Sequence, residues 1–151
     1  MNTDFVVDSF FGSAIQVYTG EYPSGAFIRL FKPTKKEVLI LLDLQGNTVV
    51  PEQYAAYIKL ESWYPTGVNS IYRAVLAEMH KDKELYTSWS SLAKIKQDFT
   101  LKVINLRHRW YARQHPGNNT LAVLTYKFSA PSEWYIHITQ DLSVGWCGLG
   151  D

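Results

Sequence analysis

Cysteine is nearly absent from this chain, and so are the features that mark a secreted or membrane protein. Cys147 is the only cysteine, so the chain can form neither an internal disulfide nor a zinc site of several cysteines. It has no run of about eighteen apolar residues, since even VLILLDL stops at Asp43. The N-terminal MNTDFVVDSFFGSA lacks the basic region of a signal peptide. We therefore expect a soluble, cytoplasmic protein without a transmembrane helix.

Motifs of enzymes and of metal or phosphate sites are also missing. The sequence contains no HxH or HxxxH pair, no GxGxxG or GxxxxGKS/T loop and no GxSxG elbow. His137 belongs to a His-x-Thr motif, but phosphoesterases of that type use two such motifs, and no second one occurs. We therefore expect no catalytic residue, metal or cofactor. An enzyme with a dispersed site around His108, His115 or His137 remains an alternative.

Neither sign of charge is in excess. Fifteen Lys and Arg against fourteen Asp and Glu give a net charge of +1, so the chain lacks the overall field that draws a protein to nucleic acid or to an anionic membrane. Hydrophobic residues make up 46% and charged residues 19%, which is typical of a folded protein. At 151 residues, we expect one domain, residues 1–151.

The order of apolar and turn residues predicts an α+β fold. Strands are predicted where β-branched and aromatic residues lie between turn signals, at residues 4–10, 14–18, 25–31, 37–44, 99–107, 121–128 and 134–139. The fourth strand is apolar almost throughout, which indicates a central place in the sheet. Pro51 begins a predicted helix that ends at Pro65 and Gly67, and a second helix follows over 68–79.

These elements predict a mostly antiparallel sheet of about six to seven strands with a helical hairpin packed on one face. Residues 80–98 show no sustained period and are predicted to form a loop with one short helical turn at most. The glycine-rich C-terminal VGWCGLGD is expected to be irregular.

The most distinctive local feature is LRHRWYARQHPG, in which cations alternate with aromatic rings. Between residues 99 and 115 there are four basic residues and no acidic one. We call residues 107–115 the basic aromatic segment and take as candidate partner-binding residues Arg107, His108, Arg109, Trp110, Tyr111, Arg113 and His115. Such a pattern serves protein interfaces and also RNA or single-stranded DNA. A solvated hairpin without a binding role would show the same pattern.

The middle of the chain resembles a known group of proteins. A strand is followed by PEQYAAYIKLESWY, a break, and SIYRAVLAEMHKD. Over residues 38–82 this order resembles small bacterial α+β proteins of unassigned function, in which a helix led by Pro-x-Gln precedes a second helix rich in Ala and Leu. Some of their relatives are immunity proteins of bacterial toxin systems. The resemblance implies a cytoplasmic protein that binds and neutralises a cognate toxin domain.

We therefore predict an immunity-type protein that contacts a toxin domain through the basic aromatic segment and the loop at 80–98. Inhibitors of basic nucleases are acidic, whereas this chain has a net charge of +1. The expected toxin therefore presents an acidic surface or is bound mainly through apolar and aromatic contacts. The alternative is a nucleic-acid-binding module that uses the same segment.

Overall fold

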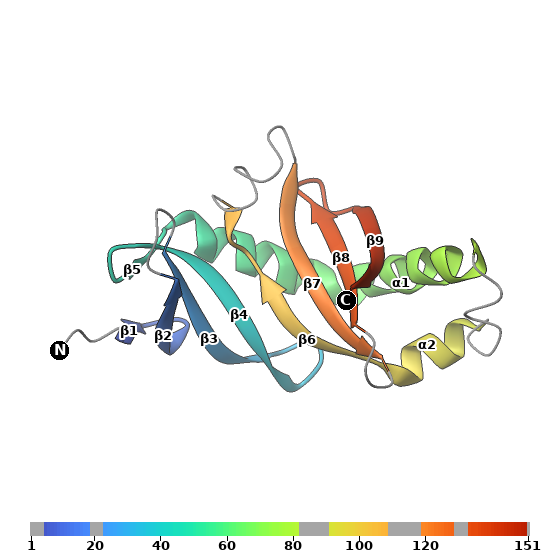
Figure 1. Ribbon diagram of the computed structural model, residues 1–151, viewed down its shortest axis with the longest axis horizontal. Helices are drawn as coiled ribbons and strands as arrows, with labels where there is room; N and C mark the ends of the chain where they lie inside the picture. Colours follow the sequence, from blue (N-terminus) through green and yellow to red (C-terminus); the bar gives the residue numbers. More distant parts are fainter. Residues whose placement is uncertain (1–4, 19–22, 82–90, 109–118, 129–132, 151) are drawn as a thin grey trace.

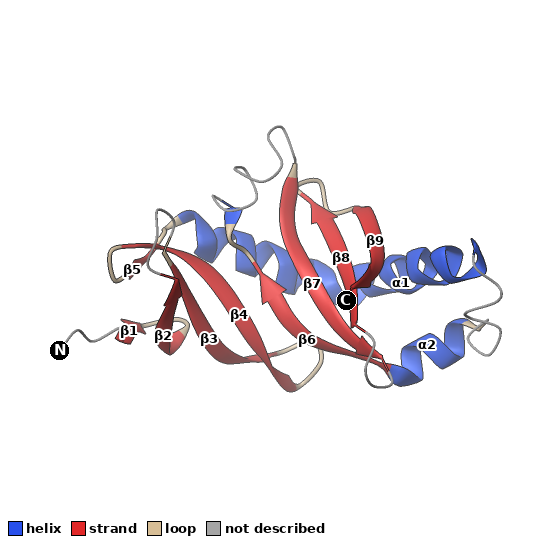
Figure 2. Cartoon of the chain, viewed as in Figure 1, coloured by secondary structure: helices blue, strands red, loops and turns tan. Residues whose placement is uncertain are grey.

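The computed structural model describes residues 5–18, 23–81, 91–108, 119–128 and 133–150 (Figure 1). Within this part of the chain, Figure 2 shows one large sheet and two helices. The strands are β1 (Phe5–Asp8), β2 (Gly12–Tyr18), β3 (Ser24–Phe31), β4 (Lys36–Gln45), β5 (Thr48–Val49), β6 (Phe99–Asn105), β7 (Thr120–Phe128), β8 (Glu133–Thr139) and β9 (Val144–Gly150). The helices are α1 (Glu52–Lys81) and α2 (Leu92–Asp98).

The sheet consists of two antiparallel meanders joined by one parallel pair. The strand order is β1-β2-β3-β4-β6-β7-β8-β9, and the short β5 pairs with β4. Strands β4 and β6 pair in parallel over only three residue pairs, Leu39 to Leu41 against Val103 to Asn105, and they diverge toward their starts (Figure 1). The α+β class, the mostly antiparallel sheet and the central place of β4 are confirmed.

The predicted strand number is wrong, because the described residues form nine strands. The main addition is β9, a glycine-rich segment whose sequence predicts an irregular end. Glycines weaken a strand, but six of the seven residues of β9 have a direct partner on β8. Trp146, for example, faces His137, and Cys147 faces Ile136. This cross-strand pairing outweighs the low strand propensity of the segment.

The predicted helical hairpin is also wrong, because α1 runs without a break through Pro65. A proline inside a helix costs about 3 kcal/mol or more, but Pro65 is exposed, and the buried side of the helix continues on both sides of it. That side comprises Gln53, Ala56, Tyr57, Leu60, Tyr64, Gly67, Ile71, Val75 and Met79. Burying each large apolar side chain contributes about 1.5–3 kcal/mol, so several of them outweigh the proline.

Helix α1 covers one face of the sheet (Figure 1). Directly paired residues lie on the same face of a sheet, and one row of them crosses the molecule beneath the helix. It consists of Val6, Ala14, Phe27, Ile40, Ile104, Leu124, Ile136 and Cys147, and all eight are buried. Neither α1 nor α2 combines the length and the hydropathy that crossing a bilayer requires.

The first turns of α1 are attached to the turn between β1 and β2 by hydrogen bonds. Asp8 accepts hydrogen bonds from the backbone N–H groups of Phe10 and Phe11, both at 2.8 Å, and from the hydroxyl of Tyr54. Arg29 of β3 donates to the Phe10 carbonyl at 2.6 Å and to the Tyr57 hydroxyl at 3.3 Å. Its guanidinium carbon also lies 4.1 Å from the centre of the Phe10 ring. These contacts fix the start of the helix against the N-terminal meander.

Candidate functional site

The face of the sheet opposite α1 carries an apolar surface, which we call the open face. One row of directly paired residues crosses it from β3 to β9: Ile28, Leu39, Val103, Thr125, Tyr135 and Gly148. A second row runs parallel to the first: Ala26, Leu41, Asn105, Val123, His137 and Trp146. Neither row contains Asp, Glu, Lys or Arg.

The open face is partly accessible. Ile28 is 66% exposed and Trp146 53% exposed, near opposite ends of the two rows. Val123 and Thr125, in the middle, are nearly buried by their neighbours, and most other members are intermediate. Exposed apolar residues that stand alone are ordinary on a protein surface, but contiguous ones indicate an interaction site.

Trp146 has a fixed orientation on this face. Its ring meets the His137 ring edge to face, with the centroids 5.2 Å apart and the planes at 89°. It also lies over Gly148, where an added Cβ would come within 2.7 Å of Cζ2. The residues at 146 and 148 point to the same face because side chains alternate along a strand. A half-exposed indole held in this way loses little freedom on binding.

The basic aromatic segment begins at one end of the open face. Arg107 donates to the side-chain oxygen of Asn105 through its backbone N–H at 3.1 Å and through Nε at 3.0 Å, and Asn105 belongs to the second row. The Nε2 atom of His108 lies 2.6 Å from the Leu121 carbonyl oxygen. The structure therefore brings Arg107 to the open face and uses His108 to hold the chain beside β7. The remaining candidates, Arg109, Trp110, Tyr111, Arg113 and His115, lie outside the described residues, as do residues 82–90 of the predicted loop at 80–98. The loop prediction is wrong for residues 92–98, which form α2.

Among the described residues, no three of His, Cys, Asp and Glu gather in a way that could hold a metal ion. His137 lies on the open face beside Trp146. Burial raises the pKa of the Cys147 thiol to about 11, and Glu78 adds to the effect, so the thiol is protonated at neutral pH and is a poor nucleophile.

Sequence reasoning missed the open face, although a signal for it was present. Strands β3, β4 and β7 carry apolar residues at both alternate sets of positions, as in AFIRLF, VLILLDL and TLAVLTYKF. Such a pattern is expected when both faces of a sheet are covered. In the described structure only one face carries a helix, so the second apolar set, including Ile28, Leu39 and Val103, is left for another role.

Comparison with known proteins gives no further guidance, because no protein-family model, no curated protein and no solved structure matches this chain.

Proposed function

We propose that this protein binds another protein through the open face of its sheet, with Arg107 at the rim of the contact. The observation that carries the proposal is the pair of largely apolar rows, free of Asp, Glu, Lys and Arg, that cross the sheet opposite α1. Residues 38–82 resemble relatives of immunity proteins, and we infer from this that the partner is a toxin domain that the protein neutralises in the cytoplasm.

The distribution of charge favours a protein over a nucleic acid as the partner. Binding to nucleic acid depends on many lysines and arginines that contact phosphates, and the two rows contain none. Arg107 adds one cation at the end of the second row, close to Asn105. Cations and aromatic rings at the rim of an apolar surface are typical of protein interfaces. We expect the partner to present an apolar patch with an acidic group at its edge, opposite Arg107.

Trp146 is the expected anchor of the interface. Tryptophan is enriched among the few residues that dominate binding energies, and this one is exposed and oriented by His137 and Gly148. Because its orientation is fixed before binding, complex formation costs less side-chain entropy there. Trp146→Ala should weaken binding by about thirtyfold, the effect of losing one such anchor residue.

The first test is co-expression with the protein encoded by the adjacent gene. If that protein is a toxin, co-expression should restore growth, and the two chains should purify as a stable complex. Two folded proteins that do not bind each other would contradict the proposed pairing. Binding to single-stranded RNA or DNA that falls steeply with salt would favour the nucleic-acid alternative instead.

A matched pair of variants tests the role of the open face itself. Ile28→Glu places a charge on the open face, where Ile28 is 66% exposed, whereas Ile58→Glu places the same charge on α1, where Ile58 is 50% exposed. Both side chains are accessible, so both variants should fold with nearly unchanged circular dichroism. Only Ile28→Glu should weaken the complex, by about tenfold or more. Equal weakening by both, or by neither, would exclude the open face as the interface.

A further inference from the structure

A cavity opens on the helix side of the sheet, where β4 and β6 diverge. Its volume is about 100 Å³, and the described residues that line it are Thr34, Lys36, Tyr64, Tyr72, Phe99, Thr100, Leu101 and Tyr126. The parallel pairing of β4 and β6 begins only at Leu39 and Val103, so their first residues are separated, and α1 closes the space from behind. The cavity thus results from the topology of the sheet and lies on the opposite side from the open face.

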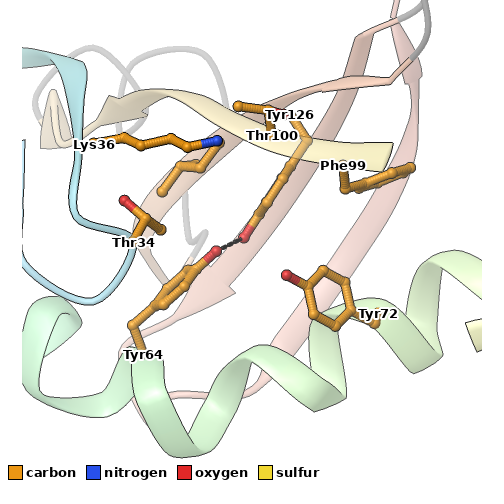
Figure 3. Close-up of a pocket in the computed structure, with 8 residues that line it drawn as sticks. Thr34, Lys36, Tyr64, Tyr72, Phe99, Thr100 and Tyr126 are labelled. Carbon is orange, nitrogen blue, oxygen red and sulfur yellow. Dashed lines mark hydrogen bonds between the residues drawn. The ribbon is translucent and has the colours of Figure 1, made fainter. Parts of the chain in front are cut away.

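Three phenol groups converge inside this cavity (Figure 3). The hydroxyls of Tyr64 and Tyr126 are hydrogen-bonded to each other, and Tyr72 points its hydroxyl toward them from the next turns of α1 (Figure 3). Tyr126 is 1% exposed and Tyr64 4%. Burial raises the pKa of Tyr126, Tyr64 and Tyr72. The neighbouring phenols add to this shift at Tyr126, whereas at Tyr64 the hydrogen bond with Tyr126 opposes it without cancelling it. All three therefore remain protonated at neutral pH and act as hydrogen-bond donors.

Two of these three O–H groups have no acceptor among the described residues. Each phenol has one O–H group, so within the Tyr64–Tyr126 pair one hydroxyl donates to the other and the second keeps its proton for another acceptor. Tyr72 makes no hydrogen bond with any other residue in the described part of the chain. Two O–H groups close together favour a ligand with two adjacent acceptor atoms, as in a carboxylate.

The rest of the lining fits a small anion with an apolar body. Lys36 extends over the Tyr64–Tyr126 pair from the start of β4 (Figure 3), and the described lining residues include no Asp or Glu. Phe99 and Leu101 supply apolar walls. An engineered cavity of about 150 Å³ holds one benzene, which has six non-hydrogen atoms. In proportion, a space of about 100 Å³ holds about four of the six non-hydrogen atoms of a branched four-carbon acid, and the remaining methyl groups project through the opening of the cavity.

We propose that this cavity binds a small monocarboxylate, with its oxygens on the phenol hydroxyls and Lys36, and its hydrocarbon part against Phe99 and Leu101. The site is independent of the protein partner, because it lies on the face of the sheet that α1 covers. Loss of binding at the open face would leave it unchanged.

The experiment is a titration of the full chain with sodium isobutyrate, followed by the backbone amide shifts of the protein. Isobutyramide, which has the same shape without the charge, is the comparison ligand. Isobutyrate should cause saturable shifts at residues around Thr100 and Tyr126, and isobutyramide should bind at least about tenfold more weakly, because hydrogen bonds to a charged acceptor are the stronger ones.

Two variants and their controls localise the site. Tyr72→Phe removes a half-buried hydroxyl without disturbing the buried Tyr64–Tyr126 pair, and Lys36→Ala removes the cation. Each should weaken isobutyrate by about tenfold. Lys32→Ala, an exposed lysine in the same β3–β4 connection, and Tyr135→Phe, on the open face, should leave its affinity unchanged. No saturable shifts, equal affinity for the amide, or shifts that Tyr72→Phe does not alter would overturn the proposal.

Discussion

Gly67 lies in the middle of α1 beneath the indole of Trp63, one helical turn earlier in the chain. A Cβ added at Gly67 would lie 1.9 Å from Cε2, 2.2 Å from Cζ2 and 2.4 Å from Cδ2 of that ring. All three distances are far below van der Waals contact, and all three atoms belong to one rigid ring. Gly67→Ala therefore forces the indole to leave its position against the core.

Two opposing terms set the effect on stability. Alanine is more favourable than glycine inside a helix by about 0.8–1.0 kcal/mol. A fully buried large apolar side chain contributes about 1.5–3 kcal/mol, and Trp63 is partly buried, so displacing it should cost about 2 kcal/mol. The net expectation is a destabilisation of about 1 kcal/mol.

The sign should reverse when the ring is absent. In a Trp63→Ala background the higher helix propensity of alanine remains, and no indole is present for the added Cβ to contact. Gly67→Ala should therefore raise the free energy of unfolding by about 1 kcal/mol. Urea unfolding of the four proteins, followed by circular dichroism, measures the interaction between the two sites. If Gly67→Ala destabilises both backgrounds equally, Trp63 is not what requires a glycine here, and the reasoning fails.

Three further outcomes are expected. Burial raises the pKa of Asp8, but hydrogen bonds from Tyr54 and the backbone lower it more. The stabilising contribution of Asp8 should therefore be complete above about pH 5 and decline as the pH falls through its lowered pKa. Asp8→Asn should remove that part of the acid sensitivity in unfolding curves. With its pKa raised to about 11, Cys147 should react with iodoacetamide at pH 8 far more slowly than it does in the urea-unfolded chain, and equal rates would contradict its burial. Arg29→Met should lower the free energy of unfolding by about 1–3 kcal/mol, whereas Arg73→Met, at an exposed position of α1, should change it by less than about 0.5 kcal/mol.

Strong local patterns predicted most of the fold. Strands such as EVLILLDL and the helical spacing of Ile71, Val75 and Met79 are visible in the sequence because their apolar residues repeat with the period of the element. The predicted helix break at Pro65 and the failure to predict β9 are errors of the same kind. In both, long-range burial outweighs a local signal: α1 keeps its buried side across the proline, and β8 provides pairing partners for a glycine-rich segment.

The candidate site could be predicted only in part. The basic aromatic segment is conspicuous in the sequence, and its first residue, Arg107, does lie at the open face through Asn105. The open face itself depends on which residues are brought side by side by strand register, such as Leu41, Asn105 and Val123. In a hairpin a short turn fixes the register, but α1 and α2 lie between β4 and β6 in the chain. The register of this pair therefore cannot be read from either strand alone.

The narrow parallel pairing of β4 with β6 has a consequence for the order of assembly. Each meander is built from segments adjacent in sequence, so each can form from local contacts at a small cost in loop closure. The parallel pair closes a much longer loop that includes all of α1, and both rows of the open face cross it, at Leu39–Val103 and at Leu41–Asn105. The complete surface therefore exists only after both halves have joined. A partner that needs both rows would bind the finished fold alone, and its binding would stabilise the molecule against separation of the halves.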